Sequence, residues 1–144
     1  MIYPANNEYV DYASELVKEG EIIVYPTDTL YGLGVDATNT EAIRLLNFLK
    51  GRSEPLSVVV SDIDMIDKYA IVNPEFFDII NSLFPGPFTF LLQKKPSGLS
   101  PLVTLNSPSI GIRIPDHNFP RNIVKKSGCP IITSSINRHG KQPL

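Results

Sequence analysis

The stretch Glu21-Ile-Ile-Val-Tyr-Pro-Thr-Asp-Thr-Leu-Tyr-Gly-Leu-Gly34 decides the fold that we predict for this chain. Residues 22–25 are β-branched or aromatic, which predicts a buried strand, and Pro26 ends it because proline has no N–H to donate to a ladder. Three hydroxyls and a carboxylate follow within residues 27–31, and Gly32 and Gly34 let the backbone approach another group closely. Such polar groups after a buried strand are typical of ligand sites in open α/β sheets, although a turn capped by Asp and Thr would use the same residues.

The composition is that of a globular domain. The chain has 144 residues, of which 42% are hydrophobic and 19% charged, so it can build a core and is not disordered. The net charge of −2 excludes a protein that coats nucleic acid through bulk charge, but not a local basic groove. The single cysteine excludes an internal disulfide, and the two histidines do not form a zinc-type cluster. Without a signal-peptide pattern or a membrane-length apolar run, the expected location is the cytoplasm.

Strands and helices are expected to alternate, which predicts an α/β fold with a mixed sheet and one domain over residues 1–144. The expected helices carry apolar side chains at helical spacing, with Asn7 as the first cap and a capping box at residues 38–41. They cover residues 7–20, 38–51, 62–68, 73–83 and 118–127. The expected strands cover residues 22–25, 55–60, 88–93, 109–115 and 130–133.

Two basic residues, Lys50 and Arg52, flank the expected end of the second helix. Cations at this position are favoured by the helix dipole, which is one interpretation. The other is a phosphate clamp, in which lysine is a mobile point charge and arginine a planar, two-pronged donor. Neither G-x-x-x-x-G-K-[ST] nor G-x-G-x-x-G occurs, so the common phosphate-binding loops are excluded.

Arg113 lies between two isoleucines in an apolar strand, and a buried guanidinium must meet an anion. The anion is either a structural Asp or Glu, or the carboxylate or phosphate of a substrate. Ser134, Ser135 and Asn137 follow the last expected strand, where they either cap a turn or hydrogen-bond a nucleotide or substrate.

Four motifs occur in order along the chain. They are Tyr25-Pro-Thr-Asp-Thr-Leu-Tyr-Gly-Leu-Gly34, Lys50-Gly-Arg-Ser-Glu-Pro-Leu56, Phe84-Pro-Gly-Pro-Phe-Thr89 with Gly111-Ile-Arg-Ile-Pro-Asp-His117, and Thr133-Ser-Ser-Ile-Asn137. As a set they resemble the YrdC/YciO family, the L-threonylcarbamoyladenylate synthases, from about Glu21 onward. The resemblance implies a YrdC-like α/β fold, an open, twisted mixed sheet with flanking helices and a concave ligand face.

The resemblance also implies a nucleotidyltransferase. L-threonine, bicarbonate and ATP would give threonylcarbamoyl-AMP and pyrophosphate, and the product would supply the threonylcarbamoyladenosine modification of tRNA. A carbamate formed from threonine and bicarbonate would attack the α-phosphate, so no covalent protein nucleophile is expected. Mg²⁺ is expected with ATP, because it binds mainly through phosphate oxygens. Possible partners are tRNA or double-stranded RNA and companion tRNA-modification proteins, and no membrane is expected.

Matched position by position, the resemblance assigns residues to each substrate. The threonine ligands would be Thr29, Arg113 and Thr133. The ATP ligands would be Lys50, Arg52, Ser109, Ser135 and Asn137. Lys50 and Arg52 are also the expected catalytic residues, because they would neutralise the charge that develops on the departing pyrophosphate. No protein ligand to a metal is expected.

Relatives usually continue for several elements beyond the position of Leu144, so we expect either a fragment or a naturally short relative. Exposed edges and apolar surface would then remain where those elements pack. The alternative function is a non-catalytic, YciO-like protein that binds RNA or nucleotide. Its basic face would be formed by Lys50, Arg52, Lys94, Lys95, Arg121, Lys125, Lys126 and Arg138.

Overall fold

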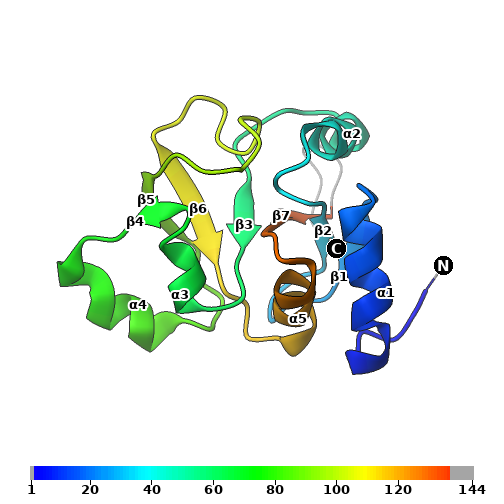
Figure 1. The fold of residues 1–144 in the computed structure, drawn as a ribbon, viewed down its shortest axis with the longest axis horizontal. Coiled ribbons are helices and arrows are strands. Elements are labelled where there is room, and N and C mark those ends of the chain that lie inside the picture. Colours follow the sequence, from blue (N-terminus) through cyan, green and yellow to red (C-terminus); the bar gives the residue numbers. More distant parts are fainter. Residues whose placement is uncertain (1, 137–144) are drawn as a thin grey trace.

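The computed structural model describes residues 2–136, which form a seven-stranded sheet in the order β1-β2-β7-β3-β6-β5-β4 (Figure 1). Strands β3 and β6 are parallel, and every other neighbouring pair is antiparallel. The predicted α/β class with an open mixed sheet is therefore confirmed. The strands are β1 (Ile23–Tyr25), β2 (Gly32–Gly34), β3 (Ser57–Val59), β4 (Ala70–Ile71), β5 (Phe90–Lys94), β6 (Ser109–Arg113) and β7 (Ile131–Ser135).

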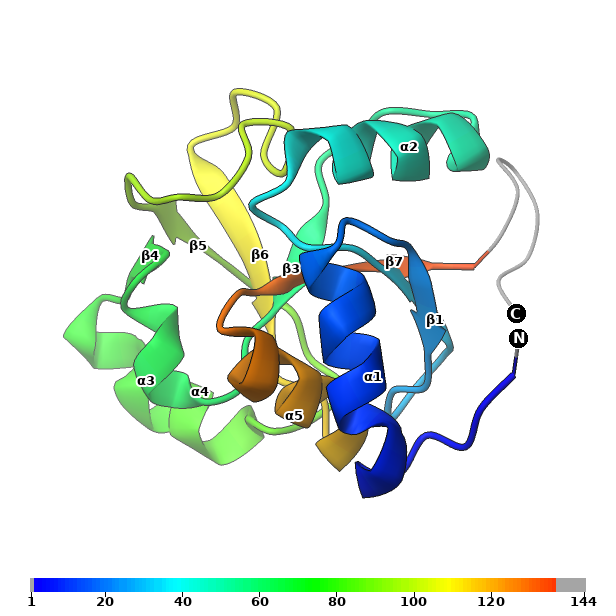
Figure 2. The same cartoon turned by 45° about the vertical axis from the view of Figure 1, so that its right-hand side comes forward.

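Helices cover both faces of this sheet. Helices α1 (Asn7–Lys18) and α5 (Asn118–Ser127) lie side by side on one face, and α2 (Thr40–Lys50) lies against the other (Figure 2). Helix α3 (Ile63–Ile66), the 3₁₀ turn η1 (Pro74–Phe76) and α4 (Phe77–Leu83) lie beside β4 and β5, at the end of the sheet opposite α1 (Figure 1). Among residues 2–136, no helix has the length and apolarity that crossing a membrane requires.

The buried apolar residues form two clusters, one on each face of the sheet, and these show which way the side chains of β7 point. Ile131 packs in the cluster that contains α1 and α5, whereas Ile132 packs in the cluster that contains α2. Because successive side chains on a strand point to opposite faces, Thr133 and Ser135 project on the α1/α5 face and Ser134 projects toward α2.

Helix ends follow the expected signals with small shifts. Asn6 rather than Asn7 caps α1, because its side chain accepts a hydrogen bond from the Glu8 N–H. The capping box predicted at residues 38–41 makes Thr38 the cap, which is wrong. The cap of α2 is Asn39, whose side chain accepts a hydrogen bond from the Ala42 N–H at 3.0 Å. Helix α2 ends as predicted at Gly51, which adopts a left-handed conformation that glycine allows at no steric cost.

Strand β2 was missed by sequence reasoning, because Gly-Leu-Gly has low strand propensity. Its pairing to β1 brings both glycines over the buried ring of Tyr25. A Cβ atom at Gly34 would lie 2.6 Å from Tyr25 Cε1, and one at Gly32 would lie 3.0 Å from Tyr25 Cζ. The close approach predicted for these glycines is therefore an approach to Tyr25. Strand β4 was also missed, because it has only two residues.

Apolar side chains remain exposed on several of the described elements. Val24 lies on the outermost strand β1, and Leu45, Phe48 and Leu49 lie on α2, with Phe48 81% exposed. The expectation that further elements pack on such surface stays a prediction.

Candidate functional site

A cavity of about 160 Å³ lies where the loop between β1 and β2 meets strands β3, β6 and β7. Most of its wall consists of small polar side chains and loop backbone, with one guanidinium. The cavity is lined by Thr29, Leu30, Tyr31, Gly32, Ser57, Thr89, Arg113, Thr133, Ser134 and Ser135. It therefore brings together all three predicted threonine ligands and one predicted ATP ligand, Ser135.

The floor of the cavity depends on strand register. Ser57 of β3 is paired with Thr133 on one side and with Gly111 on the other, so these residues share a face of the sheet. A Cβ atom at Gly111 would lie 2.5 Å from Ser57 Oγ. Glycine at position 111 therefore leaves the room that the Ser57 hydroxyl occupies.

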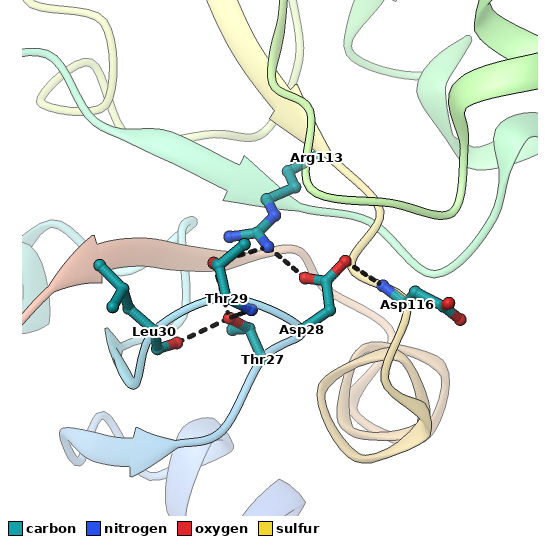
Figure 3. A network of polar contacts seen from close by, with 6 residues as sticks. All are labelled: Thr27, Asp28, Thr29, Leu30, Arg113 and Asp116. Carbon is teal, nitrogen blue, oxygen red and sulfur yellow. Dashed lines mark hydrogen bonds and ion pairs between the residues drawn. The ribbon is translucent and has the colours of Figure 1, made fainter.

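Arg113 joins β6 to the polar loop (Figure 3). Its Nη2 donates to Asp28 Oδ1 and, at 3.0 Å, to Thr29 Oγ1. The Arg113 and Asp28 side chains are only 12% and 13% exposed, so the ion pair is largely buried. The structural anion considered from the sequence is therefore present, and it is Asp28.

The guanidinium nevertheless keeps free donors. Among the described residues, Arg113 Nε and Nη1 have no hydrogen-bond partner, and Nε is buried. Because Arg113 also lines the cavity, it can serve both Asp28 and an incoming anion.

The loop that carries Thr29 is a hydrogen-bonded turn (Figure 3). Thr27 Oγ1 donates to the Leu30 carbonyl at 2.6 Å and accepts from the Thr29 N–H at 3.1 Å. The two threonine hydroxyl oxygens lie 3.2 Å apart. The capped turn that the sequence offered is therefore present, and the same loop contributes Thr29 and Leu30 to the cavity wall. Its role as a ligand site stays a prediction.

Lys50 approaches β7 from the α2 side of the sheet. Its Nζ donates to Ser134 Oγ at 2.5 Å and to the Ser135 carbonyl at 2.7 Å. Burial lowers the pKa of this ammonium below its ordinary value of 10.5, nearby Arg52 lowers it further, and Glu54 opposes the change. Lys50 therefore contacts the strand that lines the cavity, although it is not itself in the cavity wall.

The other predicted ATP ligands are more dispersed. Arg52 Nε lies 2.9 Å from Glu54 Oε1, and Arg52 lines a separate depression of about 650 Å³ together with Arg44 and Phe48. Ser109 lies at the start of β6 and does not line the cavity. Asn137 lies outside the described residues, so its role stays a prediction.

Most members of the hypothetical basic face are engaged within the chain. Lys94 donates to Thr104 Oγ1 at 2.9 Å, Lys95 donates to the Asp67 carbonyl, and Arg121 donates to the Ser61 carbonyl at 3.0 Å. Lys126 pairs with Asp11 at 3.4 Å. Arg138 lies outside the described residues. This distribution does not favour the alternative RNA-binding reading.

Tyr25 is buried against Gly32 of the cavity wall, and its substitution tests the hydrogen bond that it makes there. Its hydroxyl donates to the Ile132 carbonyl at 3.1 Å, and burial raises its pKa to about 12. We expect Tyr25→Phe to lower the free energy of unfolding at neutral pH by roughly 1–2 kcal/mol, because a buried hydrogen bond is lost. Chemical denaturation of both proteins measures the difference.

The same pair of proteins gives a pH signature. The unfolded tyrosine releases its proton near its ordinary pKa of 10, but the native one holds it to about 12. Between these values the native state binds more protons, so stability falls as pH rises. The advantage of the wild type over Tyr25→Phe should be full below pH 10 and narrow toward pH 12. A constant difference across this range would contradict the assignment.

The family of the chain is decided by comparison with known proteins. The sequence model of the Sua5/YciO/YrdC family, described as telomere recombination, matches residues 15–144. The chain belongs to this family. The resemblance stated from four motifs is therefore confirmed, and its ordered set was sufficient to identify the Sua5/YciO/YrdC fold.

Named relatives of this Sua5/YciO/YrdC chain include threonylcarbamoyl-AMP synthases. The chain is 37% identical to the one from Bacillus subtilis over 94% of its own length and 40% of that protein. It is 38% identical to a putative threonylcarbamoyl-AMP synthase from Methanocaldococcus jannaschii, over 98% of its own length and 68% of that protein. The chain thus spans less than half of the Bacillus relative.

Solved structures have the same fold. The P. abyssi Sua5 complexed with L-threonine superposes with a TM-score of 0.87 and 26% identity, over 96% of this chain and 41% of that one. E. coli YciO superposes with a TM-score of 0.84 at 23% identity, over 94% of this chain and 67% of that one, which shows the fold alone.

The sequence predicted Thr29, Arg113, Thr133 and Ser135 as ligands, and Ser134 as a candidate, but not the rest of the wall. It missed Asp28, Ser57 and Thr89 as functional residues. Asp28 had a signal, because it lies in the polar stretch and Arg113 needed an anion. Thr89 lies at the end of a quoted motif. Ser57 had no signal, since only strand register brings it to the cavity.

Proposed function

We propose that this chain forms threonylcarbamoyl-AMP and pyrophosphate from L-threonine, bicarbonate and ATP, with threonine bound in the 160 Å³ cavity. The observation that carries the proposal is Arg113, a largely buried arginine at the cavity wall with two guanidinium nitrogens free of described partners. The names of the relatives and of the threonine-bound neighbour support the choice of substrate. The product would supply tRNA modification in the cytoplasm, with companion proteins completing it.

The cavity suits a small amino acid. Its volume is below the range of about 300–1,000 Å³ that larger ligands occupy. The threonine carboxylate would accept hydrogen bonds from Arg113, and the hydroxyls of Thr29 and Thr133 would hold the remaining polar groups. The substrate amine would then lie in this small polar cavity, where it would react with bicarbonate to form the carbamate and release water.

ATP would lie outside this cavity, because a nucleotide is too large for it. Lys50 reaches Ser134 and Ser135 at the end of β7, and Arg52 lines the separate depression beside α2. We assign the phosphates to this side, with Lys50 and Arg52 as the charges that stabilise departing pyrophosphate. The carbamate oxygen would form a bond to the α-phosphorus as the bond to the pyrophosphate oxygen breaks.

Mg²⁺ is proposed to accompany ATP. Its preference for phosphate oxygens and water means that it needs few protein ligands in such sites. The described residues contain no group of three or more His, Cys, Asp or Glu side chains that could hold a metal ion. When bound, the ion would neutralise phosphate charge, and the residues named above would do the positioning.

The proposal is tested with the purified chain, ATP, Mg²⁺ and bicarbonate, with and without L-threonine. Threonine-dependent release of pyrophosphate, with threonylcarbamoyl-AMP identified by mass spectrometry, is the expected result. Calorimetry with threonine alone tests the cavity separately. Threonine binding without pyrophosphate release would refute the enzymatic activity, and the absence of both would refute the cavity assignment as well.

A further inference from the structure

Asp28 is the carboxylate that pairs with the Arg113 guanidinium. It accepts from Arg113 Nη2 through Oδ1 and from the Asp116 N–H through Oδ2, at 3.0 Å (Figure 3). The carboxylate therefore connects the loop after β1, the end of β6 and the segment that leads into α5. Arg113 lines the cavity and Asp28 does not, so the two charges have different access to a ligand.

We propose that Asp28 is a positioning residue for amino-acid recognition, which holds the Arg113 guanidinium at the cavity wall, where it can meet the substrate carboxylate. This inference rests on the proposed function. It goes beyond the ligand set, because Asp28 would act through Arg113 and would not touch the substrate.

The opposite role would be that of a competing anion. In that case Asp28 would occupy Arg113 in the free protein, and the substrate carboxylate would have to displace it. Three observations favour the holding role. Asp28 is only 13% exposed, its second oxygen is engaged by Asp116, and Thr29 secures the same Nη2 at 3.0 Å. Displacing Asp28 would leave a carboxylate buried without its cation, which is strongly unfavourable.

The two roles predict opposite changes in Asp28→Asn, which keeps the shape but removes the charge. If Asp28 holds Arg113, the KM for threonine should rise roughly 10- to 100-fold, because a misplaced binding group weakens a site by such factors. The KM for ATP should change little. If Asp28 competes, the KM for threonine should fall. Initial rates of pyrophosphate release against each substrate measure both constants.

Asp36→Asn is a matched control. Asp36 also stabilises a turn, accepting from the Thr38 N–H at 2.8 Å and from the Thr38 hydroxyl at 2.6 Å, but it does not line the cavity. This variant should leave the KM for threonine unchanged. Asp28→Glu, which keeps the charge on a longer side chain, should fold even if Asp28→Asn does not, and should show a smaller rise in the same constant.

The outcomes separate the two proposals. If the wild-type chain shows neither threonine binding nor threonine-dependent pyrophosphate release, the proposed function is refuted, and the positioning role is refuted with it. If the wild type is active but Asp28→Asn leaves the KM for threonine unchanged or lowers it, the positioning role alone is overturned. If Asp28→Asn does not fold, the same result in Asp28→Glu decides. Equal rises in both KM values would indicate a general structural effect and would also overturn it.

Discussion

Arg113→Ala is expected to lower the free energy of unfolding by about 3–5 kcal/mol, because it removes one partner of a buried ion pair. The Asp28 carboxylate, 13% exposed, would keep the Asp116 N–H but lose its cation. The same change removes the guanidinium from the cavity wall. We therefore expect threonine affinity to fall by about 2–5 kcal/mol, which is roughly 30-fold or more.

Two further variants isolate the buried charge. Arg44→Ala breaks an exposed ion pair with Glu41, whose side chains are 62% and 80% exposed, and should cost less than about 1 kcal/mol. The double variant Arg113→Ala with Asp28→Asn should recover part of the stability, because no charge is then left uncompensated. Chemical denaturation compares the four proteins. A loss below 1 kcal/mol in Arg113→Ala would contradict the structural role of the pair.

Lys50→Met is expected to reduce the rate of pyrophosphate formation by about 10²–10³-fold, because a cation placed where charge develops contributes an effect of this size. Threonine binding should be nearly unchanged, since Lys50 contacts β7 from the α2 side and does not line the cavity. Single-turnover kinetics and threonine calorimetry measure the two effects separately. A loss of threonine binding as large as the loss of rate would contradict the division of the site into two sides.

Lys50 also makes the stability of the protein pH-dependent. Its native pKa is lowered from 10.5, so below the native pKa both states hold the proton, and above 10.5 neither does. Between these values only the unfolded state is protonated, so stability rises with pH through this window. The stability of the wild type relative to Lys50→Met should increase there. A difference between the two proteins that stays constant through this window would contradict the assignment.

Local sequence signals placed the helices because they depend on neighbouring residues. The left-handed Gly51 ends α2, and the Asn73-Pro74 pair begins η1, as expected from capping and proline chemistry. The caps of α1 and α2 were each misassigned, because several adjacent Asn and Thr side chains can bond the same N–H groups. Strand β2 was missed for a different reason, since a Gly-Leu-Gly segment becomes a strand through its partners.

In the candidate site, too, some features follow from local sequence and others only from the tertiary structure. The sequence by itself determined that Arg113 needs an anion, that residues 27–31 are a polar turn, and that the ordered motifs match one family. Only the tertiary structure decided that Asp28, 85 positions away, supplies the anion, and that strand register brings Ser57 and Thr133 to one cavity. It also decided that the close approach at Gly34 is to Tyr25. The physical reason is that periodicity and capping depend on residues a few positions apart. Which groups contact a buried charge or a glycine depends on how distant segments pack together.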